Sequence, residues 1–261
     1  MPRLDSELVR RGIARSRERA KEMIRAGSVT VNGASASKAS LEVAETDEIL
    51  SAEEELYVGR GALKLEKAAQ EFGIDFTGLR CLDIGASTGG FTDYMLRNGA
   101  AAVAAVDVGH GQLAQSLRDD PRVTVLEGTD IRDVTAETIG GHPDFVCADV
   151  SFISLTKILP KIYELLRDGA CAALLIKPQF EAGRSDVGKR GIVKDPRVHE
   201  RILRDIDSFA AGLGFTAQAY TYSPVRGGSG NIEYLVKLVK QPGTPVIHDF
   251  HALVGSAFRM L

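Results

Sequence analysis

The sequence predicts an α/β protein whose main domain has a mostly parallel, seven-stranded sheet and is preceded by a small α+β domain. From residue 80 onward, short apolar segments alternate with helical patterns, which is the signature of repeated β-α units. A glycine-rich turn from Asp83 to Phe91 follows the first of these segments. The first forty residues are basic and have a different pattern, which indicates a separate domain.

Length and composition agree with this organisation. The 261 residues can form one full α/β domain and one small domain, and the net charge is −3. No segment approaches the roughly eighteen consecutive apolar residues of a membrane-spanning helix. The first residues also lack the apolar stretch of a secretory signal. We therefore expect a cytoplasmic protein with no membrane association.

Three cysteines, Cys81, Cys147 and Cys171, are scattered along the chain, and each lies in an apolar segment with strand character. An odd, unclustered set argues against a disulfide framework and against a zinc site. We expect reduced, buried thiols, as in a reducing compartment, and no bound metal.

Charge is distributed unevenly along the chain. Residues 1–40 contain nine Lys and Arg against four Asp and Glu, a balance of +5, whereas residues 41–56 contain seven acids and no base. A basic module set apart by an acidic stretch is typical of nucleic-acid binding. Charge alone fits a solvated helix face equally well.

The order of elements in the basic module separates these alternatives. A short amphipathic helix begins near Leu4, and Ser16 is the expected N-cap of a second helix. Val29–Val31 is a strand that leads into Asn32-Gly33, a strong hairpin signal, and residues 47–50 supply a later strand.

This order resembles the S4 RNA-binding domain, and the run from Ser16 to Gly33 matches the characteristic sequence of that domain. The resemblance covers roughly residues 3–50, so we assign residues 1–51 to an S4-like domain. It implies a helix-turn-helix face that binds structured RNA. The candidate RNA-binding residues are the cations of this module and one arginine just beyond it: Arg3, Arg10, Arg11, Arg15, Arg17, Arg19, Lys21 and Arg60.

A linker at residues 52–61 leads to the main domain, residues 62–261. Its entry helix, 62–72, is expected to bury Leu63, Leu65, Ala68, Ala69 and Phe72. The expected strands are 81–85, 102–107, 123–126, 144–149, 171–176, 216–222 and 234–239. The expected helices are 92–98, 112–118, 155–166 and 196–213. In such sheets, ligands bind at the carboxyl ends of the strands.

The turn after the first strand differs from the usual nucleotide-binding patterns. A dinucleotide fold needs Gly-x-Gly-x-x-Gly, but Ser87 occupies the second glycine position, and the Gly-Lys-Ser/Thr ending of a phosphate loop is absent. The acids Asp83, Asp107 and Asp130 fall at the ends of three successive strands. A carboxylate lining suits a cationic ligand without phosphate, and S-adenosylmethionine fits this description. Asp83 and Asp130 could instead cap a helix or a turn.

In this interpretation Asp107 holds the ribose diol, Asp130 faces the adenine amine, and the glycines let the backbone approach the ligand closely. The candidate cofactor-binding residues surround the glycine turn and the neighbouring strand ends: Asp83, Gly85, Ala86, Ser87, Gly89, Gly90, Phe91, Asp107, Val108, Asp130, Ile131 and Asp149.

Four residues are candidates for the reaction chemistry. Lys64 lies on the entry helix, and Asp149, Lys177 and Glu233 lie at strand ends, where side chains can converge. A lysine beside a second lysine in a desolvated cleft loses basicity, and its neutral amine can accept a proton from a ribose hydroxyl. For each residue taken alone, the alternative is an ordinary surface salt bridge.

Nearly the whole chain resembles the TlyA group of ribosomal RNA 2′-O-methyltransferases, in which an S4 domain precedes an FtsJ-like domain with the Rossmann-like class I methyltransferase fold. The matching motifs, besides the S4 run, are Gly59–Leu65, Asp83–Phe91, Asp149–Ser154, Ile176–Glu181 and Gly230–Tyr234. The resemblance implies a Lys-Asp-Lys-Glu catalytic set at Lys64, Asp149, Lys177 and Glu233, with Lys177 as the principal base.

The resemblance further implies S-adenosylmethionine-dependent methylation of cytidine ribose, with ribosomal RNA or a ribosomal subunit as the partner. The S4 helix begins almost at the first residue, as in the shorter form of the family, which favours the large subunit and leaves the small subunit as the alternative.

Two other classes of function are weighed against this one. Members of the group are often labelled haemolysins, but a signal and a spanning helix are not visible in the sequence. A non-catalytic RNA-binding assembly factor would not need the intact Lys-Asp-Lys-Glu set. The C-terminal segment 246–260, with His248 and His251, is expected to pack on the domain and to bind neither membrane nor metal.

Overall fold

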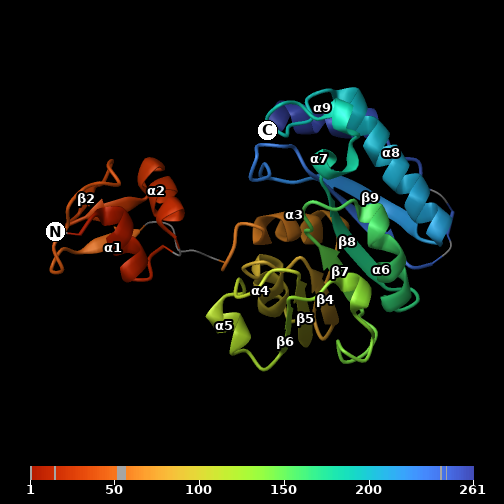
Figure 1. Cartoon of the computed structure of the whole chain (residues 1–261), viewed down its shortest axis with the longest axis horizontal. Helices are drawn as coiled ribbons and strands as arrows, with labels where there is room; N and C mark the ends of the chain where they lie inside the picture. The colour runs from red at the N-terminus through yellow and green to blue at the C-terminus, as the bar shows by residue number, and fades with distance from the viewer. Residues whose placement is uncertain (1, 15, 52–56, 242, 245) are drawn as a thin grey trace. The chain divides into compact units, whose positions relative to one another are not determined.

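The computed structural model describes residues 2–14, 16–51, 57–241, 243–244 and 246–261. The chain forms two compact units, Met1–Leu56 and Tyr57–Leu261 (Figure 1). Residues 57–61, expected in the linker, belong to the second unit: the Tyr57 ring packs edge-on against Tyr94, and the Val58 N–H donates to Asp93 at 2.9 Å. Among the residues singled out above, Arg15 and the linker positions 52–56 lie outside the described residues.

The first unit has the predicted order of elements. The Ser16 hydroxyl caps the second helix by accepting the Arg19 N–H at 3.2 Å. Asn32 and Gly33, with φ of 51° and 79°, form the hairpin turn in the left-handed conformation that such a turn requires. The strands pair in the antiparallel order β2-β1-β3. The elements are α1 (Leu4–Arg10), α2 (Arg17–Arg25), β1 (Val29–Val31), β2 (Ala34–Ser35) and β3 (Ile49–Ser51).

Two acids of α1 are buried in the first unit and hold four arginines. Asp5 is 0% exposed and Glu7 is 1% exposed. Because a buried carboxylate is costly unless it is paired, these contacts support the fold of the unit. The pairs are Arg3–Asp5 at 3.1 Å, Arg17–Asp5 at 2.9 Å, Arg10–Glu7 at 2.7 Å and Arg11–Glu7 at 2.7 Å.

Arg11, one of the expected RNA-binding residues, makes structural contacts within the unit. Its guanidinium donates to Glu7 and to the carbonyl oxygens of Ala44, Glu45 and Asp47 at 2.6–3.0 Å, so it joins α1 to the segment before β3. Most of its N–H groups are therefore already engaged. Arg3, Arg10 and Arg17 remain about half exposed beside their carboxylates.

The second unit is built on a seven-stranded sheet in the order β6-β5-β4-β7-β8-β10-β9. Neighbouring strands from β6 to β8 are parallel, and β10 runs antiparallel to both β8 and β9. This confirms the predicted sheet. Its strands are β4 (Arg80–Ile84), β5 (Ala102–Asp107), β6 (Val123–Glu127), β7 (Phe145–Ala148), β8 (Cys171–Ile176), β9 (Thr216–Tyr222) and β10 (Tyr234–Val239).

Helices cover both faces of this sheet (Figure 1). One face packs against α3 (Ala62–Phe72), α4 (Gly90–Arg97) and α5 (Gln115–Arg118). The other face packs against α6 (Leu159–Leu165), α8 (Pro196–Leu213) and α9 (Phe250–Met260). Shorter helical turns follow strands near the carboxyl edge: α7 (Pro178–Glu181), η1 (Ile131–Asp133), η2 (Leu155–Lys157) and η3 (Arg184–Asp186).

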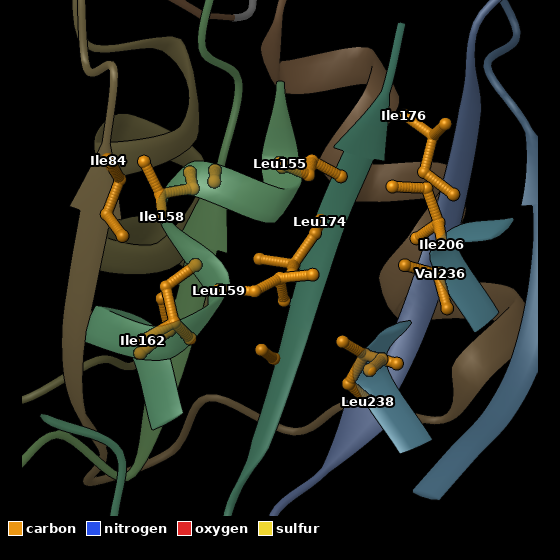
Figure 2. Close-up of a cluster of buried hydrophobic side chains, with 14 of the residues drawn as sticks. Ile84, Leu155, Ile158, Leu159, Ile162, Leu174, Ile176, Ile206, Val236 and Leu238 are labelled. Atoms are coloured by element: carbon orange, nitrogen blue, oxygen red, sulfur yellow. The ribbon is translucent and has the colours of Figure 1, made fainter. Parts of the chain in front are cut away.

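Strand periodicity divides the core into these two layers. In β4, Cys81 faces the α3–α4 layer, whereas Leu82 and Ile84 face the α6–α8 layer. Figure 2 shows the second layer, where Leu174 of β8 and Val236 of β10 lie among side chains from η2, α6 and α8. The three cysteines are free thiols on strands β4, β7 and β8, and two of them are fully buried.

Three local expectations are corrected by the structure. Leu63 is 37% exposed, because the inward stripe of α3 is formed by residues 62, 65, 68, 69 and 72. The predicted helix 112–118 begins only at Gln115, since the N–H groups of residues 111–113 donate to the Glu127 carboxylate instead. The predicted helix 155–166 is divided into η2 and α6 around Ile158, and a proline occupies the first turn of α6.

The C-terminal segment packs on the domain as predicted. Val254 and Ala257 of α9 are buried in the α6–α8 layer. The His248 ring bonds the Ala217 carbonyl, and the His251 ring bonds Glu200. Within the described residues, no helix is long and apolar enough to cross a membrane.

The first unit should lose stability in acid through Glu7. Hydrogen bonds from Arg10 and Arg11 lower the Glu7 pKa from 4.5 to about 2, so its contribution is complete above about pH 4.5 and is lost as the pH falls toward 2. Glu7→Gln should remove this part of the pH dependence. Amide hydrogen exchange of peptides from α1 and α2, followed by mass spectrometry between pH 5 and pH 2, measures it. Glu18→Gln, at an exposed acid of α2, is the control and should keep the wild-type dependence.

Candidate active site

A pocket of about 480 Å³ opens at the carboxyl ends of β4, β5 and β7. The strand order reverses here, because β5 lies on one side of β4 and β7 on the other, and such switch points are the usual ligand sites of α/β sheets. Its lining comprises Ile84, Gly85, Ser87, Val106, Asp107, Val108, Gln112, Thr129, Asp130, Ile131, Asp149, Val150, Ser151, Phe152, Ile153 and Ile158. Seven predicted cofactor residues are in this set: Gly85, Ser87, Asp107, Val108, Asp130, Ile131 and Asp149.

The turn after β4 is shaped by Asp107 as much as by glycine. Ser87 has a left-handed φ of 49°, and its N–H donates to Asp107 at 2.8 Å. The other Asp107 oxygen accepts the Gly109 N–H at 2.7 Å. The Ser87 hydroxyl also bonds Gln112, a lining residue that the sequence analysis missed. This carboxylate therefore fixes the loops on both sides of the pocket mouth.

A side chain added to the glycines of the turn would meet protein, and Gly85 also lines the pocket. A Cβ on Gly85, where φ is +80°, would lie 2.8 Å from the Asp149 carbonyl oxygen. A Cβ on Gly89 would lie 2.2 Å from the Leu117 side chain, and one on Gly90 would lie 3.0 Å from the backbone of Ala62. These glycines let α4 pack closely on α3 and α5, and Gly85 lets the end of β4 lie next to the backbone of Asp149.

Asp83 lies beneath the pocket, not in its wall. It is 0% exposed and accepts the Thr92 hydroxyl of α4 at 2.7 Å. Burial raises its pKa to about 7, against the effect of the Thr92 hydrogen bond. Ala86, Gly90 and Phe91 are buried in the same way. Through Thr92, Asp83 ties the helix that follows the turn to its strand.

Asp130 lies in the pocket wall and also caps a helical turn. It lines the pocket, and its carboxylate caps η1 by accepting the Arg132 N–H at 2.9 Å. The Arg132 guanidinium lies 2.6 Å away and lowers the Asp130 pKa. The carboxylate is thus ionised and held at the edge of the pocket.

The four candidate catalytic residues converge in one network. Lys64 Nζ lies 3.0 Å from Asp149 Oδ2 and 2.8 Å from Glu233 Oε2. Lys177 Nζ lies 2.6 Å from Asp149 Oδ1. Lys64 comes from the first turn of α3, and the other three residues flank the ends of β7, β8 and β10. Because these residues are buried or nearly so, the surface salt-bridge alternative does not describe them.

The carboxylates decide the charge state of this network. Burial lowers the Lys64 pKa, but Asp149 and Glu233 outweigh burial and raise it above its usual value. Burial likewise raises the Asp149 pKa, but the two lysines outweigh it and lower the value. Asp149 stands between the lysines and bonds each with a different oxygen. The expectation that one lysine depresses the basicity of the other is therefore corrected for Lys64, which stays charged.

Neighbouring residues hold this network in place, and the sequence analysis did not identify them. Lys177 Nζ donates to the Ser151 hydroxyl at 2.9 Å, so this amine faces one carboxylate and one neutral oxygen. The Gln179 amide donates to Glu233 at 3.4 Å. Gly227 passes so close to Glu233 that an added Cβ would lie 2.3 Å from its carboxylate. Ser151 lies inside the Asp149–Ser154 motif and Gln179 inside the Ile176–Glu181 motif, which was the available signal, whereas Gly227 lies outside the motifs.

An exposed aromatic ring packs on Phe180, whose own ring lies 5.9 Å from Lys177 Nζ. Phe152 is 92% exposed, has a left-handed φ of 64°, and packs against Phe180 with ring centroids 5.1 Å apart. Glu181 supports its loop by accepting the Ser154 hydroxyl at 2.6 Å and the Leu155 N–H at 2.8 Å. A left-handed conformation is uncommon for a non-glycine residue.

Groups of three or more metal-ligating side chains are not found in the part of the chain that the structure describes. What the site offers is an ionised carboxylate at the wall of a pocket, in contact with two lysines that are themselves shielded from water. Such an arrangement can bind a cationic ligand and can accept a proton next to it.

Comparison with known proteins agrees with this geometry. The FtsJ-like methyltransferase model matches residues 57–240, and the S4 domain model matches residues 2–49. The 16S/23S rRNA (cytidine-2′-O)-methyltransferase TlyA of Mycobacterium tuberculosis is 48% identical over 92% of this chain and 90% of its own length. Hemolysin A of Brachyspira hyodysenteriae is 44% identical over 91% of this chain and 99% of its own length.

A solved structure from Streptococcus thermophilus that bears a hemolysin name superposes with a TM-score of 0.80 and 41% identity, over 99% of this chain and 96% of its own. Both the matched residues and the fold support one assignment. The chain belongs to the FtsJ-like methyltransferase family and carries an S4 domain ahead of its methyltransferase domain.

Proposed function

We propose that this protein transfers a methyl group from S-adenosylmethionine to the 2′-oxygen of cytidine ribose in ribosomal RNA. One observation carries the proposal: Asp149 lines the cofactor-sized pocket and also bonds both lysines of the buried network. A ligand in the pocket is therefore adjacent to groups that can accept a proton. The name of the M. tuberculosis relative supplies the nucleotide and the RNA class, and RNA of either ribosomal subunit fits that name.

The pocket suits S-adenosylmethionine in size and in charge. Its volume of about 480 Å³ lies within the range of small-molecule sites, and Asp107, Asp130 and Asp149 contribute carboxylates to it. In this proposal Asp107 holds the ribose diol, and Val108 and Ile131 offer apolar surface to the adenine. When bound, the cofactor supplies a methyl group on a positively charged sulfur, which the carboxylates favour.

Lys177 is the proposed base. As the ribose oxygen takes the methyl group, its proton passes to Nζ of Lys177, which then carries the positive charge. Asp149 stabilises that charge at 2.6 Å, and Ser151 fixes the amine from another direction. Lys64 remains charged and pairs with the second oxygen of Asp149, so that Asp149 stays ionised throughout.

The RNA is held by the cations of the S4 unit and by aromatic surface at the site. Arg3, Arg10 and Arg17 are ordered by their buried acids, which reduces the entropy lost when they bind phosphate. Unpaired bases stack on exposed aromatic rings, and Phe152 offers such a ring, packed on the Phe180 ring that lies near Lys177.

Incubation with S-adenosylmethionine carrying a labelled methyl group tests the proposal. Label should enter ribosomal RNA from cells that lack this activity, and mapping should place it on the 2′-oxygen of a cytidine. Label on a base, on another nucleoside or on protein would contradict the proposal. Leakage of dye from liposomes, without methyl transfer, would favour the haemolysin alternative. RNA binding without transfer would favour an assembly factor.

Loss of the Lys177 amine should abolish transfer but not binding. Lys177→Ala should lower the single-turnover rate by roughly 10²- to 10⁴-fold, the usual effect of removing a general base. Lys177→Arg should fail as well, because a guanidinium stays charged and cannot accept a proton. The affinities for cofactor and RNA, measured separately, should persist. High activity of Lys177→Arg would show that the residue acts only as a positive charge.

Asp107→Asn should weaken the binding of S-adenosylmethionine. Replacing the carboxylate that holds the ribose diol removes a charged hydrogen-bond acceptor worth about 1.5–3 kcal/mol, or roughly 10- to 100-fold in affinity. Calorimetry on the folded variant measures the effect. Asp168→Asn, at a fully exposed acid on the opposite edge of the sheet, is the matched control. Equal affinities in the two variants would remove Asp107 from the cofactor site.

A further inference from the structure

A basic loop joins α7, the short helix after Lys177, to α8. Residues 182–194 contain the exposed cations Arg184, Lys189, Arg190 and Lys194. The only acid among residues 182–194, Asp186, is already paired with Arg201 of α8 at 2.6 Å. Lys189, Arg190 and Lys194 have no ion pair with any residue that the structure describes. The loop therefore carries positive charge that the fold does not neutralise.

Lys189 and Arg190 occupy the tip of a tight turn. The Gly191 N–H donates to the Gly188 carbonyl at 2.8 Å, and the Gly188 N–H donates to the Ile192 carbonyl at 3.0 Å. Gly191 has a φ of +73°, which closes the turn. The two cations are thus the central residues of a hydrogen-bonded turn, and both side chains are exposed.

Asn231 fixes this turn to the catalytic network. Its side chain is fully buried, donates to the Gly191 carbonyl at 2.8 Å and accepts the Val193 N–H at 3.0 Å. Two residues later the chain reaches Glu233, which bonds Lys64. Figure 1 shows the blue segment before β10 beside the helix α7 that begins after Lys177. The position of the turn is therefore set by the segment just before β10, which also carries Glu233.

We infer that the Lys189-Arg190 turn binds the phosphate backbone of the substrate RNA beside the target ribose, as a contact separate from the S4 unit. The inference rests on the proposed function. Lysine meets a phosphate as a point charge, and arginine meets it as a two-pronged donor, so adjacent side chains can bind adjacent phosphates. Backbone contacts of this kind set the register of a strand without reading its bases. Here they would hold the ribose in register with Lys177.

The test compares two full-length double variants of equal charge. Lys189→Gln with Arg190→Gln removes the turn cations, and Arg122→Gln with Arg167→Gln removes two exposed cations at the amino edge of the sheet. Binding to transcribed large-subunit ribosomal RNA is measured from low to moderate salt. If both cations contact phosphate, the slope of log K against log salt should fall by about 1.4–1.8 in the first variant only.

In methyl-transfer assays the turn variant should have a raised KM for RNA, a kcat near that of the wild type, and unchanged calorimetric affinity for S-adenosylmethionine. A salt slope and a KM equal to those of the control variant would overturn the inference. So would a fall in kcat alone, which would indicate a structural role for the turn.

An effect seen on assembled subunits but not on naked RNA would assign the turn to a protein partner instead. Absence of methyl transfer by the wild type would overturn the proposed function itself, and the two failures are therefore distinguishable.

Discussion

The site depends on the Asp149 carboxylate, which is shared between two lysines and a pocket. One oxygen meets Lys64 at 3.0 Å and the other meets Lys177 at 2.6 Å. A buried carboxylate between two ammonium groups stays ionised, and its lowered pKa follows from their charges. Through this one side chain, the first turn of α3 and the ends of β7 and β8 are held at a common point. A ligand in the pocket meets the same point.

The glycine turn serves this arrangement mainly by allowing close packing. Gly85 leaves room for the Asp149 backbone, so the strand that carries the shared carboxylate lies against the strand that carries the turn. The Asp149 N–H completes the contact by donating to the Ile84 carbonyl at 2.9 Å. A side chain at position 85 would therefore displace the Asp149 backbone.

In the S4 unit, too, buried carboxylates hold cationic side chains in place. Asp5 and Glu7 are buried acids, yet they support a basic surface, because each holds two guanidinium groups in defined places. The second unit also positions cations through a buried polar side chain, but there the side chain bonds the backbone of a turn and not the cations themselves. There Asn231 holds a turn by two hydrogen bonds, and the turn displays its cations. In both units, buried polar side chains thus hold exposed cations in defined positions.

Local patterns in the sequence by themselves determined the elements of both units, because strand alternation, Ser16 capping and the Asn32-Gly33 turn act over a few residues. Sequence motifs also identified the four residues that meet at the site. Their pairing was decided only by tertiary structure, since no local pattern says that Asp149 separates Lys64 from Lys177. The same holds for Asp83, whose burial depends on how α4 packs, and for Ser151 and Asn231, whose partners come from distant segments. Contacts between residues far apart in the chain set the burial and the charge state of these side chains. Those two properties decide whether the residues form a functional site.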